Sequence, residues 1–414
     1  MRFRRSVVLI AILLVVFTIY VSANSGPTFW DVSPSSESLA IEEDSPIEVL
    51  HETLIFDGRN SRTDNFSMLT RITAAYNMHN TSNQTHTSQM AFPFVTSYYE
   101  LSDSIEVMVD GNAVPYKVYS GDPVNAGGNP NVKVSSPEFS FEHITNTIMP
   151  DYYQSNILKP GSQGTLCTFV VEDGPEDYEV GITYDDASNA TIFSIGFNGY
   201  SIKGSRKEAS GWQRNGELAS IFVIGDIPET SVKVYEDPAG NKEVTGYTAT
   251  IIYQEMTYKT YFEGYIEPYI AKLNEQREQE PIELLDDIQL YNLITRSAEA
   301  YMHELEGLLP VESACDALDY ERLFTIVYEV PFEGDETRAV EVSYDGRSSM
   351  DSRDMNYEAH TFKYLLNPAS HWQSFGGLDV HIYTSELYPE ILDSSLALIE
   401  DQPRSYHATY DRLP

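Results

Sequence analysis

Apolar and polar residues alternate with a period of two in several stretches of the first 257 residues. Within residues 68–78, Ile72, Ala74, Tyr76 and Met78 are separated by single residues, which predicts a strand with one buried face. The same alternation predicts strands at residues 105–109, 114–118, 165–171, 178–184, 191–197, 218–223, 232–235 and 247–254. Many short alternating strands indicate antiparallel all-β structure.

Two local signals refine this part of the prediction. Asp110-Gly111 lies between two alternating runs, and an Asp-Gly pair in that position predicts a tight β-hairpin. The apolar run 90–95 contains Pro93, which cannot donate a backbone hydrogen bond, so we expect an edge strand or a bend there.

The spacing of apolar residues changes after residue 257. From Leu284 to Leu305 they recur every three or four positions, which predicts an amphipathic helix that begins near Pro281 and ends before Gly307. Residues 258–274 and 312–318 are also expected to be helical. Alternation then returns in residues 324–330, 340–344, 360–366 and 378–384.

These patterns predict a mainly β protein with two antiparallel β-sandwich-like domains and a small helical segment between them. The expected divisions are a signal peptide at 1–23, a leader rich in Ser, Pro and acids at 24–45, an N-terminal sandwich at 46–257, helices at 258–318 and a C-terminal sandwich at 319–414. The last sandwich could be truncated, because residues 406–410 read as a strand with no closing partner after it.

The N-terminus predicts export. Three arginines precede an apolar run of about 14 residues and the small residues Ser22 and Ala23, which is the pattern of a secretory signal cleaved between Ala23 and Asn24. An uncleaved membrane anchor is the alternative, but the run is shorter than the roughly 20 residues that a spanning helix needs. We therefore expect a secreted or cell-surface protein.

The charge is strongly negative. The formal net charge is −37, and loss of the three arginines with the signal peptide makes it −37 − 3 = −40. Such a surface repels phosphate backbones, which argues against a nucleic-acid partner. The acids either serve solubility or bind Ca²⁺ or a basic partner. The calcium candidates are Asp173, Asp177, Asp185 and Asp186, in acidic turns that do not match an EF-hand loop.

Only two cysteines are present, Cys167 and Cys315. An exported protein could join them in a disulfide, and two free thiols are the alternative. Their wide separation does not match a structural zinc site, which uses cysteines two to four residues apart.

The segment 364–384 is rich in residues that carry chemistry. His360, His371, His381 and Asp379 could form a metal site in principle, but their spacing matches no ligand pattern. We expect instead a connection between two strands, with surface histidines, Trp372 folded back on the sandwich, and Gly376-Gly377 allowing a positive φ or a close backbone approach.

No nucleophile elbow, phosphate-binding loop, dinucleotide fingerprint or HExxH motif occurs in the sequence, so no catalytic residue or cofactor is predicted. The leading hypothesis is a non-enzymatic protein that binds or scaffolds an extracellular ligand or protein. The alternatives are a carbohydrate-active hydrolase that uses two carboxylates and the ectodomain of a membrane-anchored sensor.

Several short blocks carry a family resemblance. They are NSGPTFWDVSPSS, SPIEVLHETLIFD, AAYNMHN, MAFPFV and YLLNPASHW. Together with the signal peptide they resemble a family of uncharacterised secreted or membrane-anchored proteins of Gram-positive bacteria that share an exported domain of unknown function. The resemblance implies membrane contact only through a C-terminal anchor beyond Pro414, if the sequence is truncated. It implies no catalytic residues.

Overall fold

A computed structural model gives the structure of the chain. It describes residues 35–411 except 37, 42–44, 65–66, 102–103, 126–140, 186–189, 204–205, 215, 239, 241, 278–284, 303–307, 352–358, 366–371 and 373. The predicted signal peptide and its cleavage site at Ala23 and Asn24 lie outside the described residues. Of the described residues, 53% lie in strands and 17% in helices, which confirms the mainly β fold class.

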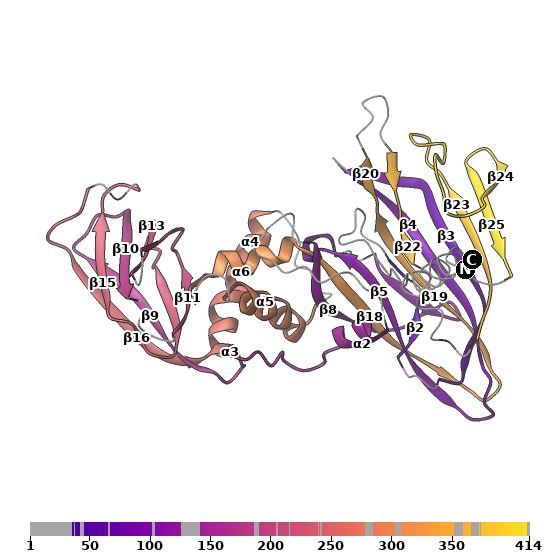
Figure 1. Cartoon of the computed structure of the whole chain (residues 1–414), viewed down its shortest axis with the longest axis horizontal. Helices are drawn as coiled ribbons and strands as arrows, with labels where there is room; N and C mark the ends of the chain where they lie inside the picture. The colour runs from indigo at the N-terminus through magenta and orange to yellow at the C-terminus, as the bar shows by residue number, and fades with distance from the viewer. Residues whose placement is uncertain are drawn as a thin grey trace, which may run out of the picture.

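The larger of two sandwiches contains two mainly antiparallel sheets (Figure 1). Sheet A has the order β22 (Tyr364–Leu365), β1 (Ser35–Ser36), β5 (His86–Thr96), β18 (Glu321–Phe332) and β8 (Tyr116–Asn125), with β2 (Leu39–Ala40) also beside β5. Sheet B has the order β24 (Ile399–Gln402), β25 (Ser405–Tyr410), β23 (Phe375–Tyr383), β3 (Ile47–Asp64), β4 (Ser67–Asn80), β19 (Thr337–Arg347), β6 (Glu106–Val109) and β7 (Asn112–Ala113). A small ribbon pairs β20 (Ser349–Asp351) with β21 (Ala359–Thr361).

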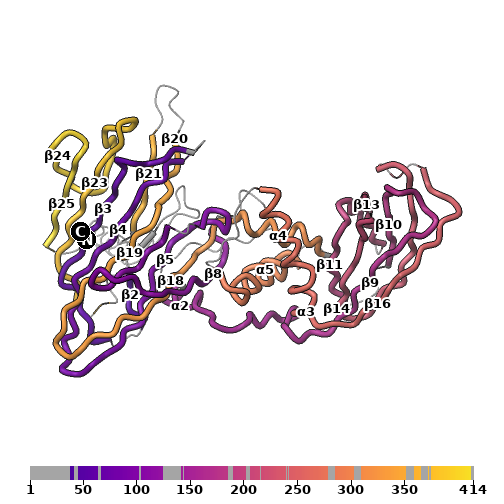
Figure 2. The backbone as a smooth tube through the Cα atoms, turned by 180° about the vertical axis from the view of Figure 1, so that it is seen from behind, coloured from indigo at the N-terminus to yellow at the C-terminus, as the bar shows by residue number. Residues whose placement is uncertain are grey.

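The smaller sandwich lies at the other end of the elongated molecule (Figures 1 and 2). Sheet C has the order β16 (Thr248–Thr257), β9 (Gln163–Glu172), β14 (Ser220–Ile224), β11 (Thr191–Ile195) and β17 (Leu308–Pro310). Sheet D has the order β12 (Gly199–Lys203), β13 (Arg206–Gln213), β10 (Tyr178–Asp185) and β15 (Thr230–Tyr235).

Helices lie between the two sandwiches (Figure 2). The helical elements are η1 (Tyr98–Glu100), α2 (Phe141–Thr147), α3 (Tyr258–Tyr261), the π-helical turn η2 (Phe262–Ile266), α4 (Glu267–Gln276), α5 (Asp287–Met302), α6 (Val311–Cys315) and η3 (Asp316–Asp319). α3 and α6 pack on sheet C, where the rings of Phe222 and Tyr261 stack with centroids 4.2 Å apart. α2 packs instead on β8 and β18 of sheet A, and α5 contacts both β17 of sheet C and β8 of sheet A. No helix in the described part of the chain is long and apolar enough to cross a membrane.

The boundaries between the structural units differ from those expected. Strands from both sides of the predicted helical segment share the same sheets, because β18 pairs with β5 and β8 in sheet A, and β19 pairs with β4 and β6 in sheet B. The larger sandwich is therefore built from residues 35–125 and 321–410, and the smaller one from a segment inserted between them. The division at 46–257, 258–318 and 319–414 does not follow the sheets.

Part of the expected leader belongs to the core. Leu39 and Ala40 are fully buried and pair with Ala91 and Met90 of β5. The backbone carbonyl of the buried Ser38 accepts a hydrogen bond from Trp372 Nε1 at 2.9 Å. The prediction of a leader through residue 45 is thus wrong for residues 38–40, whereas the prediction that Trp372 folds back on the sandwich is confirmed.

The local turn predictions have mixed outcomes. Asp110 and Gly111 have φ values of 50° and 74°, which are the two positive angles that a type I′ hairpin turn requires. β5 is an interior strand, so the prediction of an edge strand is wrong. On the side of β5 opposite β18, β1 pairs at Phe94 and β2 pairs at Ala91, and Pro93 lies between these two pairings. β25, the strand expected to have no closing partner after it, pairs with β23 and β24, which both precede it in the sequence.

Candidate functional site

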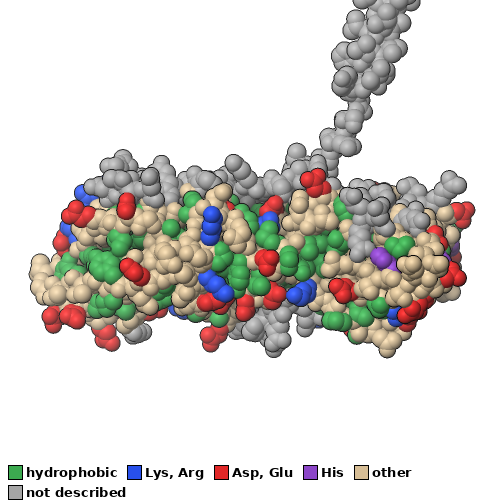
Figure 3. Space-filling model, turned by 90° about the horizontal axis from the view of Figure 1, so that it is seen from below, with side chains coloured by type: hydrophobic (Ala, Val, Ile, Leu, Met, Phe, Trp, Pro, Cys, Tyr) green, Lys and Arg blue, Asp and Glu red, His purple; other side chains and the backbone are tan. Residues whose placement is uncertain are grey.

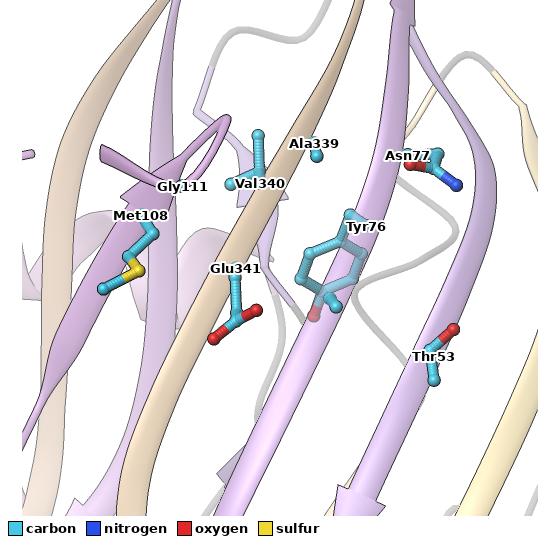
Figure 4. A pocket seen from close by; sticks show the side chains of 9 residues that line it. Thr53, Tyr76, Asn77, Met108, Gly111, Ala339, Val340 and Glu341 are labelled. Atoms are coloured by element: carbon cyan, nitrogen blue, oxygen red, sulfur yellow. The ribbon is translucent and has the colours of Figure 1, made fainter. Parts of the chain in front are cut away.

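The outer face of sheet B carries a depression of about 140 Å³ (Figure 4). Its lining residues come from β3, β4, β19, β6 and the turn after β6: Thr53, Ala75, Tyr76, Asn77, Met108, Gly111, Ala339, Val340 and Glu341. This volume is below the roughly 300 Å³ of pockets for drug-sized ligands, so the depression can hold only one small group of a ligand.

Strand alternation explains which side chains reach this face. On β4, Ile72, Ala74 and Tyr76 are buried between the sheets, and Ala75 and Asn77 point to the other side. β19 follows the same rule, so Ala339 and Glu341 lie beside them. Figure 4 shows Glu341, Thr53 and Asn77 carried by neighbouring strands around the same region of the sheet.

The hairpin turn closes one end of the depression. Asp110 accepts hydrogen bonds from the Ala339 N–H at 2.9 Å and from Arg338 Nε at 2.8 Å. The backbone donor and the guanidinium hold the pKa of Asp110 below its usual value. These contacts fix the turn that carries Gly111 against β19.

A row of side chains crosses the sheet from this depression. Glu341 is opposite Ala75, Ala75 is opposite Thr53, Thr53 is opposite Asp379, and Asp379 is opposite Thr409. Because paired residues on adjacent strands point to the same face, all five side chains lie on the outer side of sheet B. The row offers carboxylate, hydroxyl and methyl groups on β19, β4, β3, β23 and β25.

Asp379 is the centre of a hydrogen-bonded group at the far end of this row. Its Oδ2 lies 3.0 Å from His51 Nε2, and its Oδ1 accepts a hydrogen bond of 2.7 Å from Thr409 Oγ1. The Thr409 hydroxyl lowers the pKa of Asp379, and the nearby His51 and His381 lower it further. The carboxylate therefore stays ionised and holds β3, β23 and β25 together on the outer face.

Two more histidines lie next to this group. His381 is opposite His407, whose Nδ1 is 2.7 Å from Asp401 Oδ2. Across the described ranges, no group of three or more His, Cys, Asp or Glu side chains is placed to hold a metal ion. His51 and His407 are each paired with a carboxylate instead.

The structure separates the histidines that the sequence places close together. His381 and Asp379 share one face of β23, as expected. His360 is on β21, where its Nδ1 is 2.8 Å from Ser348 Oγ and its ring packs edge-on against Tyr388. His371 lies outside the described residues. His360 and His381 lie on strands, as expected, and both are half-buried.

The chemistry of nucleophilic catalysis is not supported by this geometry. In a catalytic triad the imidazole lies between the hydroxyl and the carboxylate. Here the Thr409 hydroxyl and the His51 imidazole both bind the Asp379 carboxylate, so the hydroxyl has no imidazole as its base.

The hydrolase alternative also fails for the two carboxylates of the row. Glu341 and Asp379 are separated by three strand-to-strand steps, which is about 14 Å across a sheet. Pairs of catalytic carboxylates in glycoside hydrolases are about 5 to 9.5 Å apart.

The two cysteines are free and buried. Cys167 packs between sheets C and D, whereas Cys315 belongs to the core on the helical side of sheet C. The disulfide alternative is therefore wrong in this structure, because a sheet separates the two thiols. Burial raises the pKa of the Cys167 thiol to about 11, which makes it a poor nucleophile.

The calcium candidates do not come together in what the structure describes. Asp173 and Asp177 lie on an exposed turn after β9, and Asp173 has a φ of 58°. Asp185 ends β10, and Asp186 lies outside the described residues. The calcium hypothesis stays a prediction.

The sequence did not indicate the site residues Thr53, Asn77, Met108, Glu341 and Thr409, and it did not indicate His51. His51 lies 328 residues before Asp379, and the parallel pairing of β3 with β23 brings them together. Alternation could have shown that His51, Thr53 and Ile55 share a face, but a bulge between Val49 and His51 shifts the register there.

Comparisons with known proteins add little to this picture. No family model matches the sequence, and no curated protein matches it either. A solved structure of a candidate nutrient binding protein from Legionella pneumophila is similar over 92% of this chain and 67% of its own, with 10% sequence identity and a TM-score of 0.30. Values this low do not establish a common fold.

Proposed function

We propose that the chain is a non-enzymatic binding protein of the cell exterior, and that its ligand contacts the outer face of sheet B. The observation that carries the proposal is the depression at Thr53, Asn77, Met108 and Glu341, together with the polar row that continues from it toward Asp379. Export is supported by the signal-peptide pattern of residues 1–23.

The chemistry of the depression favours a neutral ring that bears hydroxyl groups, as in a carbohydrate. Ala75, Ala339 and Met108 offer an apolar surface, and Asn77 and Glu341 offer amide and carboxylate groups that bind hydroxyls. Because the depression holds only one small group, a longer ligand would lie along the row toward Asp379. A polymer of such rings fits this geometry better than a single small molecule.

The test is glycan binding by the full chain, screened on a glycan array and quantified by calorimetry. Glu341→Gln removes the charge from the depression and should weaken binding at least about tenfold, the loss of one charge-assisted hydrogen bond. Glu329→Gln makes the same change on an exposed position of β18 in sheet A and should bind like the wild type. Equal affinities for Glu341→Gln and the wild type, or no glycan bound at all, would reject the proposal.

A further inference from the structure

β16 forms an exposed edge of the smaller sandwich. It pairs with β9 over ten consecutive residue pairs from Thr248 to Thr257 without a register shift, and no other strand of the described chain pairs with it. Nine of its ten residues are exposed or half-exposed, on both sides of the strand, with Ile252 at 54% and Tyr253 at 57%. Figure 3, seen from the side on which Figure 1 places β16, shows hydrophobic side chains at this end of the molecule as well as along its middle.

The hydrogen-bond pattern shows which backbone groups of β16 point outward. The N–H of Tyr258 donates to the carbonyl of Ser162 at 2.8 Å, in the same register that pairs Thr248 with Glu172. In an antiparallel ladder, hydrogen-bonded and non-hydrogen-bonded pairs alternate. The even-numbered residues of β16 therefore bond β9, and the odd-numbered residues from 249 to 255 turn their N–H and C=O groups away from the sheet.

β16 lacks the usual features that prevent an edge strand from pairing with another chain. Natural edge strands carry lysines, prolines or bulges, or are very short. β16 reads TATIIYQEMT, without lysine or proline, with Glu255 as its one charged residue, and with no bulge against β9. β-Branched and aromatic residues fill its centre, which favours strand pairing. An edge of this kind is suited to β-augmentation.

We propose that β16 is a homodimerisation edge, which pairs antiparallel with β16 of a second copy about a two-fold axis at Ile252. This register pairs Ile252 with Ile252, Ile251 with Tyr253 and Ala249 with Glu255 of the other copy. The four outward residues of each copy then form about eight backbone hydrogen bonds, and sheet C continues as one sheet of ten strands.

The occupant is a second copy because the strand is complementary to itself. In the two-fold register the one acid, Glu255, faces an alanine, so no like charges are opposite each other. The apolar side chains meet at the axis, where an isologous interface repeats each contact. The formal charge of −37 on each chain opposes association, and salt screens that repulsion, so the dimer should be favoured at higher ionic strength.

The experiment is sedimentation velocity of the full chain from about 1 to 100 µM, at about 0.05 and 0.5 M NaCl. We expect a concentration-dependent dimer that is more populated at the higher salt. Ile252→Lys places two like charges directly opposite at the axis, with Cα atoms about 4.5 Å apart, and should weaken the dimer at least about tenfold. Ile252→Glu should do the same, and an equimolar mixture of the two variants should restore dimers as heterodimers.

The matched control is Ile399→Lys, which changes an isoleucine of similar exposure, 59%, on the edge strand β24 of the other sandwich. It should dimerise like the wild type. Circular dichroism of each variant confirms that it is folded. A monomeric wild type at both salt concentrations would overturn the proposal, as would a dimer that Ile252→Lys leaves intact or a mixture of variants that stays monomeric.

Discussion

Gly376 lies where β23 meets the bulge of β3, and its replacement by alanine tests the architecture of the site. A Cβ atom there would lie 1.9 Å from the carbonyl oxygen of Leu50 and 2.7 Å from its carbonyl carbon. Ordinary contact begins at 3.4 Å, so the two backbones must separate by about 1.5 Å. Overpacking costs about 1–3 kcal/mol, and with rigid backbone on both sides we expect the upper end, about 3 kcal/mol.

The assay is urea unfolding of Gly376→Ala, followed by circular dichroism. If the two sandwiches unfold in separate transitions, only the one that involves sheet B should shift. Gly161→Ala is the matched control, because nothing lies within 4 Å of a Cβ atom there, and its free energy of unfolding should stay equal or rise by about 0.4–1 kcal/mol. A loss below about 1 kcal/mol for Gly376→Ala would refute the reasoning from close approach.

Three further predictions concern stability and processing. Burial raises the pKa values of Tyr99 and Tyr153 to about 12. The stability that these two tyrosines contribute is therefore complete below pH 10 and is lost as the pH rises through 12. An absorbance titration at 295 nm should show tyrosines that ionise only with unfolding. Asn80→Ala removes four hydrogen bonds of a fully buried amide and should cost about 2–3 kcal/mol in urea unfolding, whereas the exposed Asn77→Ala should cost under about 0.5 kcal/mol. Mass spectrometry of the exported protein should find Asn24 as the first residue, and an intact Met1 would show that the signal is retained.

The features that depend on nearby residues could be predicted from the sequence. The alternation in residues 68–78 corresponds to β4, and the Asp110-Gly111 turn has the two positive φ angles that its sequence requires. The helical segment at 258–274 corresponds to α3, η2 and α4. In each case the determinant is a local one, either a period of burial or the conformational freedom of a turn residue.

The arrangement of the units could not be predicted, because strand alternation specifies the face of a residue and not its neighbouring strand. β18 reads as the first strand of a new domain, yet it pairs with β5, which lies more than 200 residues earlier. The pairing of His51 with Asp379 depends on the same kind of distant contact. Composition was misleading as well, since the polar leader contributes the buried Leu39 to the core.

The two proposals are consistent in space. The ligand face on sheet B and the edge strand β16 lie at opposite ends of the elongated molecule (Figure 1). A dimer through β16 would therefore carry two ligand faces at its two far ends, and neither would be blocked by the contact between the copies. For a polymer that repeats the same group, binding at one face raises the effective concentration at the other when the spacing allows both to engage. A depression that holds only one small group could in this way contribute to strong attachment, because two weak contacts act together.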